Sequence, residues 1–173
     1  MRERLTEPRL REFMRALARE ATAEGRVYIT GGASAVVLGW RESTLDVDLQ
    51  IVPESGALFS AIPRLKESFH VNVELASPSD FIPPLPGWRD RSPFITREGK
   101  LSFHHYDFYS QALAKIERGH ELDHLDVQNM INSGLVERDR LLSFFEQIEP
   151  ELNRYPAIHP PAFRVALERT IRA

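Results

Sequence analysis

The sequence predicts an α/β fold in which a small mixed sheet with flanking helices is followed by a helical C-terminal half. Short apolar segments with every-second-residue alternation, typical of strands, occur only in the first 105 residues. Beyond residue 105, apolar residues recur at helical spacing, and Gly119 and Gly134 separate the expected helices from one another. Hydrophobic residues make up 42% of the 173 positions, enough for a core. We expect a core over residues 1–105 and a helical part over 106–173 packed on it.

The composition excludes several classes of protein. The 22 basic and 25 acidic side chains give a net charge of −3, so no overall basic balance indicates nucleic-acid binding. There is no cysteine, which excludes disulfides and thiolate metal sites. The N-terminus is charged rather than apolar, and no apolar run is long enough to span a bilayer. We therefore expect a cytoplasmic protein with no membrane partner.

The individual elements follow from periodicity and from helix stops. An amphipathic helix is expected first, with Gly25 as its end, and a helix later in the chain is expected to be interrupted at Pro63. In chain order the first 76 residues predict a helix at 8–24, a strand at 27–30, helix 33–38, strand 45–52, helix 55–68 and strand 69–76.

Residues 77–101 contain five prolines and predict a long loop packed beside the site, because proline interrupts regular structure. A fourth strand is expected at 101–103. The remaining sequence predicts helices at 106–118, 121–133 and 137–148, and a last amphipathic helix after the proline-rich stretch 156–161.

The chemistry begins at a glycine turn followed by two acids. An apolar strand leads into Gly31 and Gly32, and the next strand carries Asp46 and Asp48 at alternate positions, which places both carboxylates on one face. Two parallel carboxylates repel unless a cation lies between them, and oxygen ligands suit Mg²⁺. The glycines let the backbone approach a bulky anion, and a helix that begins there directs N–H groups at it. Together these features indicate phosphoryl transfer.

This stretch resembles the signature of the polymerase-β-type nucleotidyltransferases, a Gly-Gly or Gly-Ser turn followed by Asp-x-Asp. The Gly-Gly-x-Ser-Ala start at Gly31 and the Arg-x-Ser-Thr-x-Asp-x-Asp continuation from Arg41 are most similar to the AbiEii-type branch. That branch contains toxins of bacterial toxin–antitoxin and phage-defence systems. The resemblance implies a nucleotidyltransferase fold, Mg²⁺ or Mn²⁺ as cofactor and an NTP as substrate.

Two-metal phosphoryl transfer uses a further carboxylate, commonly on a neighbouring strand. Glu74 is the candidate, because Asn72 and Glu74 share one face of the predicted strand 69–76 while the apolar residues share the other. The family more often has Asp here, and Glu reaches one methylene further. Asp80 is the alternative third acid. The predicted metal ligands are thus Asp46, Asp48 and Glu74.

Several further residues are predicted to bind the nucleotide. The resemblance implies that Ser34 binds phosphate oxygen, although a serine there also suits a helix cap. Arg41 and Thr44 precede the acids, and a guanidinium clamps phosphate bidentately. Lys115, Arg118, Asp123 and Asp126 resemble the Lys…Arg…Asp-x-x-Asp pattern of AbiEii-type proteins, in which the lysine contacts phosphates. Lys115 is therefore a predicted catalytic residue, and Arg118 and Asp123 are predicted nucleotide-binding residues.

A competing motif overlaps this pattern. His120-Glu-x-x-His124 matches the helix of zinc metalloproteases. We discount it, because a charged Asp123 between the two histidines is unusual in such a helix, and because Gly119 places His120 at the helix start.

The predicted function is Mg²⁺-dependent transfer of a nucleotidyl group from an NTP to a hydroxyl of RNA or protein, with a cognate antitoxin or partner protein as a further expectation. The alternative is a non-catalytic regulatory protein of the same fold that binds a nucleotide or a partner. A macromolecular acceptor is expected because the helical half is large and carries arginines that would attract an acidic partner if they cluster. These are Arg118, Arg138, Arg140, Arg164, Arg169 and Arg172.

Overall fold

The computed structural model describes residues 2–173, which form two compact units. The sheet unit consists of the chain up to Ser77 together with Ser92–Tyr106. The helical unit consists of Pro78–Arg91 and Asp107–Ala173. The α/β class, with a small mixed sheet, flanking helices and a helical C-terminal half, is confirmed. The expected single boundary after residue 105 differs from this division, in which residues 78–91 group with the later helices.

The sheet unit is built on five strands in the order β5-β4-β2-β7-β6. The central strand β2 pairs antiparallel with β4 and parallel with β7, while β4 pairs parallel with β5, and β6 antiparallel with β7. A separate two-stranded ladder joins β1 and β3. The bounds are β1 Leu5–Thr6, α1 Glu7–Arg19, β2 Gly25–Thr30, α2 Gly31–Val37, β3 Ser43–Thr44, β4 Asp46–Val52, α3 Gly56–Phe69, β5 Asn72–Glu74, β6 Phe94–Glu98 and β7 Leu101–His105.

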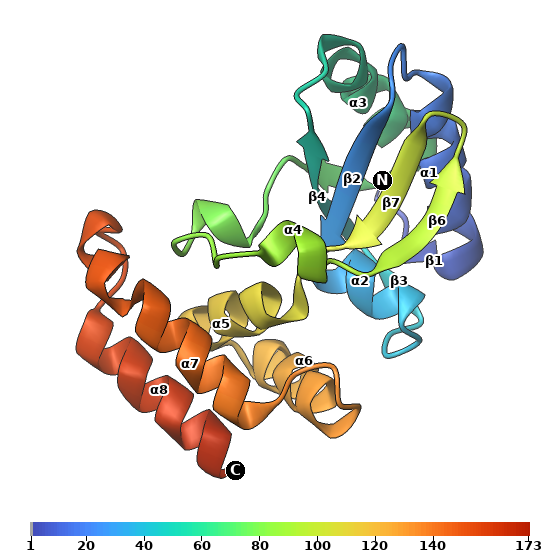
Figure 1. The fold of residues 1–173 in the computed structure, drawn as a ribbon. Helices are drawn as coiled ribbons and strands as arrows, with labels where there is room; N and C mark the ends of the chain where they lie inside the picture. The colour runs from blue at the N-terminus through green and yellow to red at the C-terminus, as the bar shows by residue number, and fades with distance from the viewer. Residues whose placement is uncertain (1) are drawn as a thin grey trace. The chain divides into compact units, whose positions relative to one another are not determined.

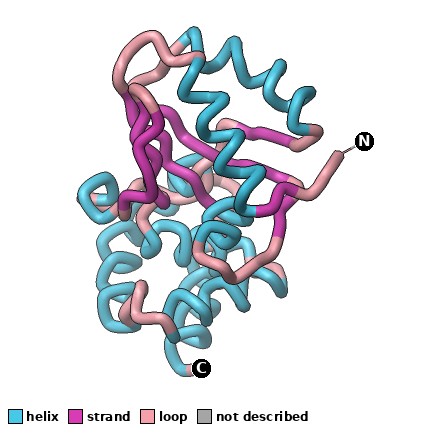
Figure 2. Tube along the Cα trace, turned by 90° about the vertical axis from the view of Figure 1, so that its right-hand side faces the viewer, coloured by secondary structure: helices cyan, strands magenta, loops and turns pink. Residues whose placement is uncertain are grey.

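The core of this unit lies on one face of the sheet, which α1 and α3 cover (Figures 1 and 2). Alternate strand residues such as Val27, Ile29, Val47 and Leu49 point into it and are completely buried. Because side chains alternate along a strand, the polar residues of β4 point to the opposite face. The predicted division of the 45–52 strand into an acidic and an apolar face is confirmed.

The helical unit packs α5 against α6, α7 and α8 (Figure 1). Asp107 begins α5 as a cap whose carboxylate accepts from the N–H groups of Tyr109 and Ser110. Arg91 donates to both oxygens of Asp107 and stacks over Phe144, which fastens the 78–91 segment to this unit. The bounds are η1 Pro78–Asp80, α4 Trp88–Arg91, α5 Phe108–Arg118, α6 Glu121–Asn132, α7 Arg138–Ile148, η2 Glu149–Arg154 and α8 Pro160–Arg172.

Three sequence expectations are wrong in detail. The first helix ends at Arg19 and does not reach Gly25, which instead opens β2. Helix α3 continues through Pro63, because an exposed proline loses one backbone bond while the flanking apolar residues stay packed. The stretch 77–101 contains η1, α4 and β6 and is not a continuous loop, since β6 acquires its hydrogen bonds from β7.

Candidate functional site

The glycine turn of the sheet unit brings backbone close to several of the predicted residues. Gly31 adopts φ +63°, a left-handed conformation that other residues rarely adopt. A Cβ on Gly32 would lie 2.5 Å from Thr44 Oγ1 and 3.2 Å from an Arg41 guanidinium nitrogen, so glycine is what lets these two side chains approach the turn. A Cβ on Gly31 would meet an Asp48 carboxylate oxygen at 3.4 Å. The turn, Arg41, Thr44 and Asp48 are therefore neighbours.

Thr44 also fixes the start of the acidic strand. Its hydroxyl donates to the Asp46 carbonyl oxygen at 2.9 Å and accepts from the Asp46 N–H at 3.3 Å. Asp46 is exposed and Asp48 half-buried, while Val47 between them is completely buried. The two carboxylates thus point away from the core, from a strand whose beginning the Thr44 hydroxyl holds.

The neighbouring strand adds the third acid to this face. In the parallel β4–β5 ladder Glu74 is paired with Asp48, and Asn72 with Asp46, so all four side chains project to the same side. The Asn72 amide nitrogen donates to Asp46 Oδ1 at 3.2 Å and to Glu74 Oε1 at 2.7 Å. The expected placement of Glu74 beside the aspartates is present, with an amide between Glu74 and Asp46. Sequence reasoning gave Asn72 no role, although its alternation with Glu74 was the available signal.

The donor chemistry of this face suits a hard divalent cation. All three predicted ligands are carboxylates, and neither Asp46 nor Glu74 forms an ion pair with any of the residues 2–173. In the described part of the chain, however, no three acidic or histidine side chains converge closely enough to hold a metal ion as they stand. Their roles as metal ligands stay predictions.

Ser34 is held by a partner that the sequence did not indicate. Its hydroxyl lies 2.7 Å from His105 Nδ1, and both side chains are buried. Burial, and then the charges of Arg11 and His104, lower the pKa of His105 to about 4, so this imidazole is neutral at pH 7. The predicted contact of Ser34 with phosphate stays a prediction. A separation of 71 residues leaves no local pattern from which this pair could have been found.

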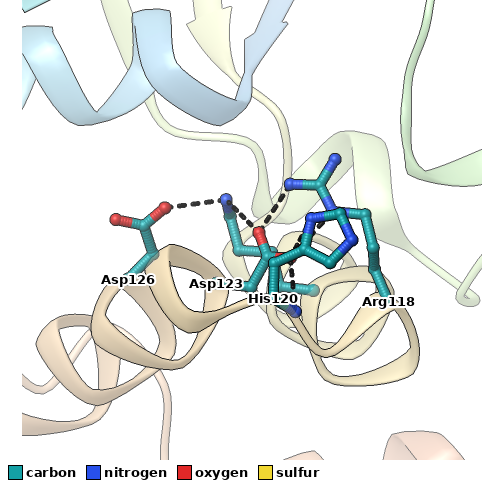
Figure 3. Close-up of polar contacts among 5 residues, drawn as sticks. Arg118, His120, Asp123 and Asp126 are labelled. Atoms are coloured by element: carbon teal, nitrogen blue, oxygen red, sulfur yellow. Dashed lines mark hydrogen bonds and ion pairs between the residues drawn. The ribbon is translucent and has the colours of Figure 1, made fainter.

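The helical unit holds the other predicted group, an ion-pair network (Figure 3). Lys115 Nζ lies 2.9 Å from Asp126 Oδ2 and 3.6 Å from Asp123 Oδ1. Arg118 donates to both oxygens of Asp123, at 2.7 and 2.6 Å. Both carboxylates and the lysine are buried, as charged groups usually are only when paired. The structure brings Lys115, Arg118 and Asp123 together, and adds Asp126.

The electrostatics of Asp123 follow from its partners. Burial alone would raise its pKa, but the hydrogen bonds from Arg118, the charges of Arg118 and Lys115, and the His120 N–H outweigh that effect and lower it. Asp123 also accepts from the His120 N–H at 3.2 Å, which caps the start of α6. His120 therefore precedes the helix, unlike the first histidine of a protease motif, and no metal-binding cluster forms here within residues 2–173.

Of the six arginines expected to attract an acidic partner, two are paired with carboxylates and a third stacks on aromatic rings. Arg118 is paired with Asp123, and Arg164 with Glu149 and Glu168. Arg140 instead stacks on Tyr109 and Phe144, with guanidinium-to-ring distances of 4.9 and 5.7 Å, and has no carboxylate partner among the described residues. The alternative third acid, Asp80, lies in η1 of the helical unit.

In residues 2–173 no helix combines the length and the apolarity needed to cross a bilayer. Searches among curated proteins and among solved structures found no match. The model of the DUF6036 family, described as a nucleotidyltransferase of unknown function, matches residues 8–157, which include both the glycine turn with its acids and the Lys115 network. The chain therefore belongs to this family of nucleotidyltransferases.

Proposed function

We propose that this protein transfers a nucleoside monophosphate from an NTP to a hydroxyl group of a macromolecule and releases pyrophosphate, with Mg²⁺ or Mn²⁺ as cofactor. The observation that carries the proposal is the parallel β4–β5 register, which aligns Glu74 with Asp48 on the face that also carries Asp46, beside a glycine turn. Family membership supports nucleotidyl transfer in general.

In this proposal Asp46, Asp48 and Glu74 are the metal ligands and are catalytic. A bound divalent cation would neutralise phosphate charge and lower the pKa of the acceptor hydroxyl. Gly31 and Gly32 are proposed to bind phosphate oxygens through their backbone. Because these two residues have no Cβ, Asp48, Arg41 and Thr44 lie close to the turn, which gathers the proposed metal-binding and phosphate-binding groups there.

Charged and polar side chains of the sheet unit add to the proposed nucleotide site, and the helical unit carries its own proposed nucleotide contacts. Arg41 and Thr44, which lie against Gly32, would bind phosphate oxygens, and Ser34 would do so if its hydroxyl leaves or shares its bond to His105. In the helical unit, Lys115 is proposed as a phosphate contact and Arg118 and Asp123 as its supports, since the two carboxylates hold the ammonium group in one place.

The acceptor is proposed to be RNA or protein. Arg140, stacked on two rings and without a carboxylate partner among residues 2–173, offers its N–H groups to phosphates or acidic side chains. The likeness of the glycine turn and of the Lys115 network to AbiEii-type proteins supports a place in a toxin–antitoxin or phage-defence system, with a cognate antitoxin as partner.

The test of the activity is incubation of the protein with each labelled NTP, MgCl₂ and a cell extract. Label in tRNA-sized RNA or in a protein band is expected, and should be absent with Asp46→Asn/Asp48→Asn, which preserves shape and removes charge. Label confined to small molecules contradicts the macromolecular acceptor. Nucleotide binding without any transfer would favour the non-catalytic, regulatory alternative.

Cation binding is tested separately by calorimetric titration with Mg²⁺ and a non-hydrolysable NTP. The wild type should show a metal-dependent signal that the double variant loses. Unchanged nucleotide affinity in the variant would rule out the metal site. A regulator gene or toxin gene beside this one would support the two-gene system.

A further inference from the structure

Asn72 occupies an unusual place on the acidic face of the sheet unit. It lies on β5 between its two acceptors, with its amide nitrogen 3.2 Å from Asp46 Oδ1 and 2.7 Å from Glu74 Oε1. One acceptor is on its own strand, two residues along, and the other is its register partner on β4. One nitrogen atom therefore links the carboxylates of two strands.

The chemistry of the partners fixes the orientation of this amide. An ionised carboxylate is an acceptor only, so the group between Asp46 and Glu74 must be the NH₂, which has two hydrogens to donate. Bonds to charged acceptors are stronger than those between neutral groups. The amide oxygen is left for other contacts.

The physical effect of this arrangement is on the spacing of charge. Two carboxylates on adjacent strands of one face repel each other, and neither Asp46 nor Glu74 has a cationic partner among residues 2–173. The positive end of the Asn72 amide dipole offsets this repulsion without adding a charge. Glu74, a longer side chain than the two aspartates, is thereby linked to Asp46 through the Asn72 amide.

We propose that Asn72 is a positioning residue that holds Glu74 beside Asp46 before a cation binds, and so determines whether Glu74 contributes to cation affinity. The inference rests on the proposed function, because it assumes a divalent cation at these acids. Asn72 contacts no reacting atom in this account and acts only through the two carboxylates.

The test measures Mn²⁺ affinity by electron paramagnetic resonance in wild type, Asn72→Leu, Glu74→Gln and the double variant. Leucine has the same branching and the same number of non-hydrogen side-chain atoms as asparagine and donates no hydrogen bond. Supporting residues of metal ligands typically change affinity by about 10–100-fold, so we expect each single variant to weaken Mn²⁺ binding about tenfold or more. Because Asn72 acts through Glu74, the double variant should be within about twofold of the weaker single variant.

Two results would overturn the proposal. One is wild-type Mn²⁺ affinity in Asn72→Leu. The other is full multiplication of the two effects in the double variant, which would show that Asn72 and Glu74 act independently. If the wild type itself binds no Mn²⁺, or binds it equally well as Asp46→Asn/Asp48→Asn, the proposed metal site fails and this inference with it. Loss of binding in that aspartate variant alone, with Asn72→Leu unaffected, refutes only the role of Asn72.

Thermal unfolding without Mn²⁺ checks that each variant folds, and a matched substitution elsewhere in the chain serves as a control. Asn129→Leu makes the same chemical change at an exposed position of α6 and should leave Mn²⁺ affinity unchanged. If Asn72→Leu does not fold, Asn72→Asp decides, since it keeps the shape and replaces the donor with a fourth carboxylate on this face. Without Mn²⁺, the melting temperature of Asn72→Asp should be lower than that of wild type. On addition of Mn²⁺, its melting temperature should rise by more than that of wild type. Equal melting behaviour with and without Mn²⁺ overturns the proposal.

Discussion

The two units of the protein each hold a group of acids, and the groups differ in how their charge is balanced. In the helical unit, Asp123 and Asp126 are buried and face Lys115, with Arg118 on Asp123. In the sheet unit, Asp46 and Glu74 are exposed, and a neutral amide is what joins them. The acids of the helical unit are neutralised by cationic side chains of the protein, whereas a neutral amide links Asp46 and Glu74 in the sheet unit.

Acidic residues therefore serve two different purposes in the two units. A buried acid with its cation in place contributes to a defined structure, and its removal strands the partner charge. An exposed acid beside another acid contributes little to folding and retains its capacity for an external cation. The contrast predicts opposite responses to the same Asp→Asn substitution in the two units.

The largest expected effect is that of Asp123→Asn. It removes the carboxylate that accepts from Arg118 and from the His120 N–H and forms an ion pair with Lys115, and it leaves the buried Lys115 with Asp126 alone. We expect the free energy of unfolding to fall by about 3 kcal/mol, as for other broken buried pairs. Urea denaturation measures it, with the exposed Glu121→Gln of the same helix as control, expected to change by about 0.5 kcal/mol or less. A similar loss in the free energy of unfolding for Asp123→Asn and Glu121→Gln would contradict a special structural role of the buried acid.

The second prediction separates the units by pH. The pKa of His105 in the folded sheet unit is about 4, below the ordinary 6.5, so between these values the unfolded chain takes up a proton that the fold excludes. Stability of the sheet unit is therefore complete above pH 6.5 and falls by up to about 3 kcal/mol toward pH 4. The pKa of His104 is also lowered, chiefly by burial, which acts in the same direction.

The helical unit should respond in a lower range. The lowered pKa of Asp123 means that its contribution is present above the ordinary carboxyl pKa of about 4 and is lost only below it. Trp40 lies in the sheet unit and Trp88 in the helical unit, so Trp88→Phe and Trp40→Phe leave one reporter each. Urea midpoints from Trp40 fluorescence should fall between pH 6.5 and 4, and those from Trp88 should not. In His105→Gln, the urea midpoint reported by Trp40 should depend less on pH. Identical midpoints at every pH would mean that the units unfold together.

The smallest expected effect is that of Asp46→Asn without metal. The substitution keeps an acceptor for Asn72 and removes one of the charges that repel each other on this face. We expect the free energy of unfolding to stay within about 0.5 kcal/mol of wild type or to rise. When MgCl₂ is added to wild type and to Asp46→Asn, the free energy of unfolding should rise in the wild type only. A loss of several kcal/mol would place Asp46 among the structural acids.

Local sequence rules predicted the parts of the fold that local forces determine. The acidic and apolar faces of β4 follow from alternation, and the helices α5, α6 and α7 from spacing and glycine stops. Strand β6 was missed because prolines and glycines dominate its surroundings, and because its order depends on pairing with β7.

The candidate site divides in the same way. The glycine turn, Asp46, Asp48 and the facing Glu74 could be predicted, since each depends on spacing within one or two neighbouring strands. The bridge made by Asn72 depends on the β4–β5 register, and the Ser34–His105 pair on the parallel β2–β7 ladder. Such pairings depend on tertiary structure and leave no local pattern to read.

The order of strands has a consequence for how the chain is made. The central strand β2 pairs with β4 on one side and with β7 on the other, and β7 ends only at His105. The helical unit includes residues 78–91, which come from the middle of the chain. During synthesis the sheet cannot close until about 105 residues have emerged, and the 78–91 segment must wait longer still, for Asp107 and Phe144. No single cut of the polypeptide separates the two units, because the backbone passes from one to the other three times, at residues 77–78, 91–92 and 106–107. A truncation at one position therefore never yields one whole unit without residues of the other.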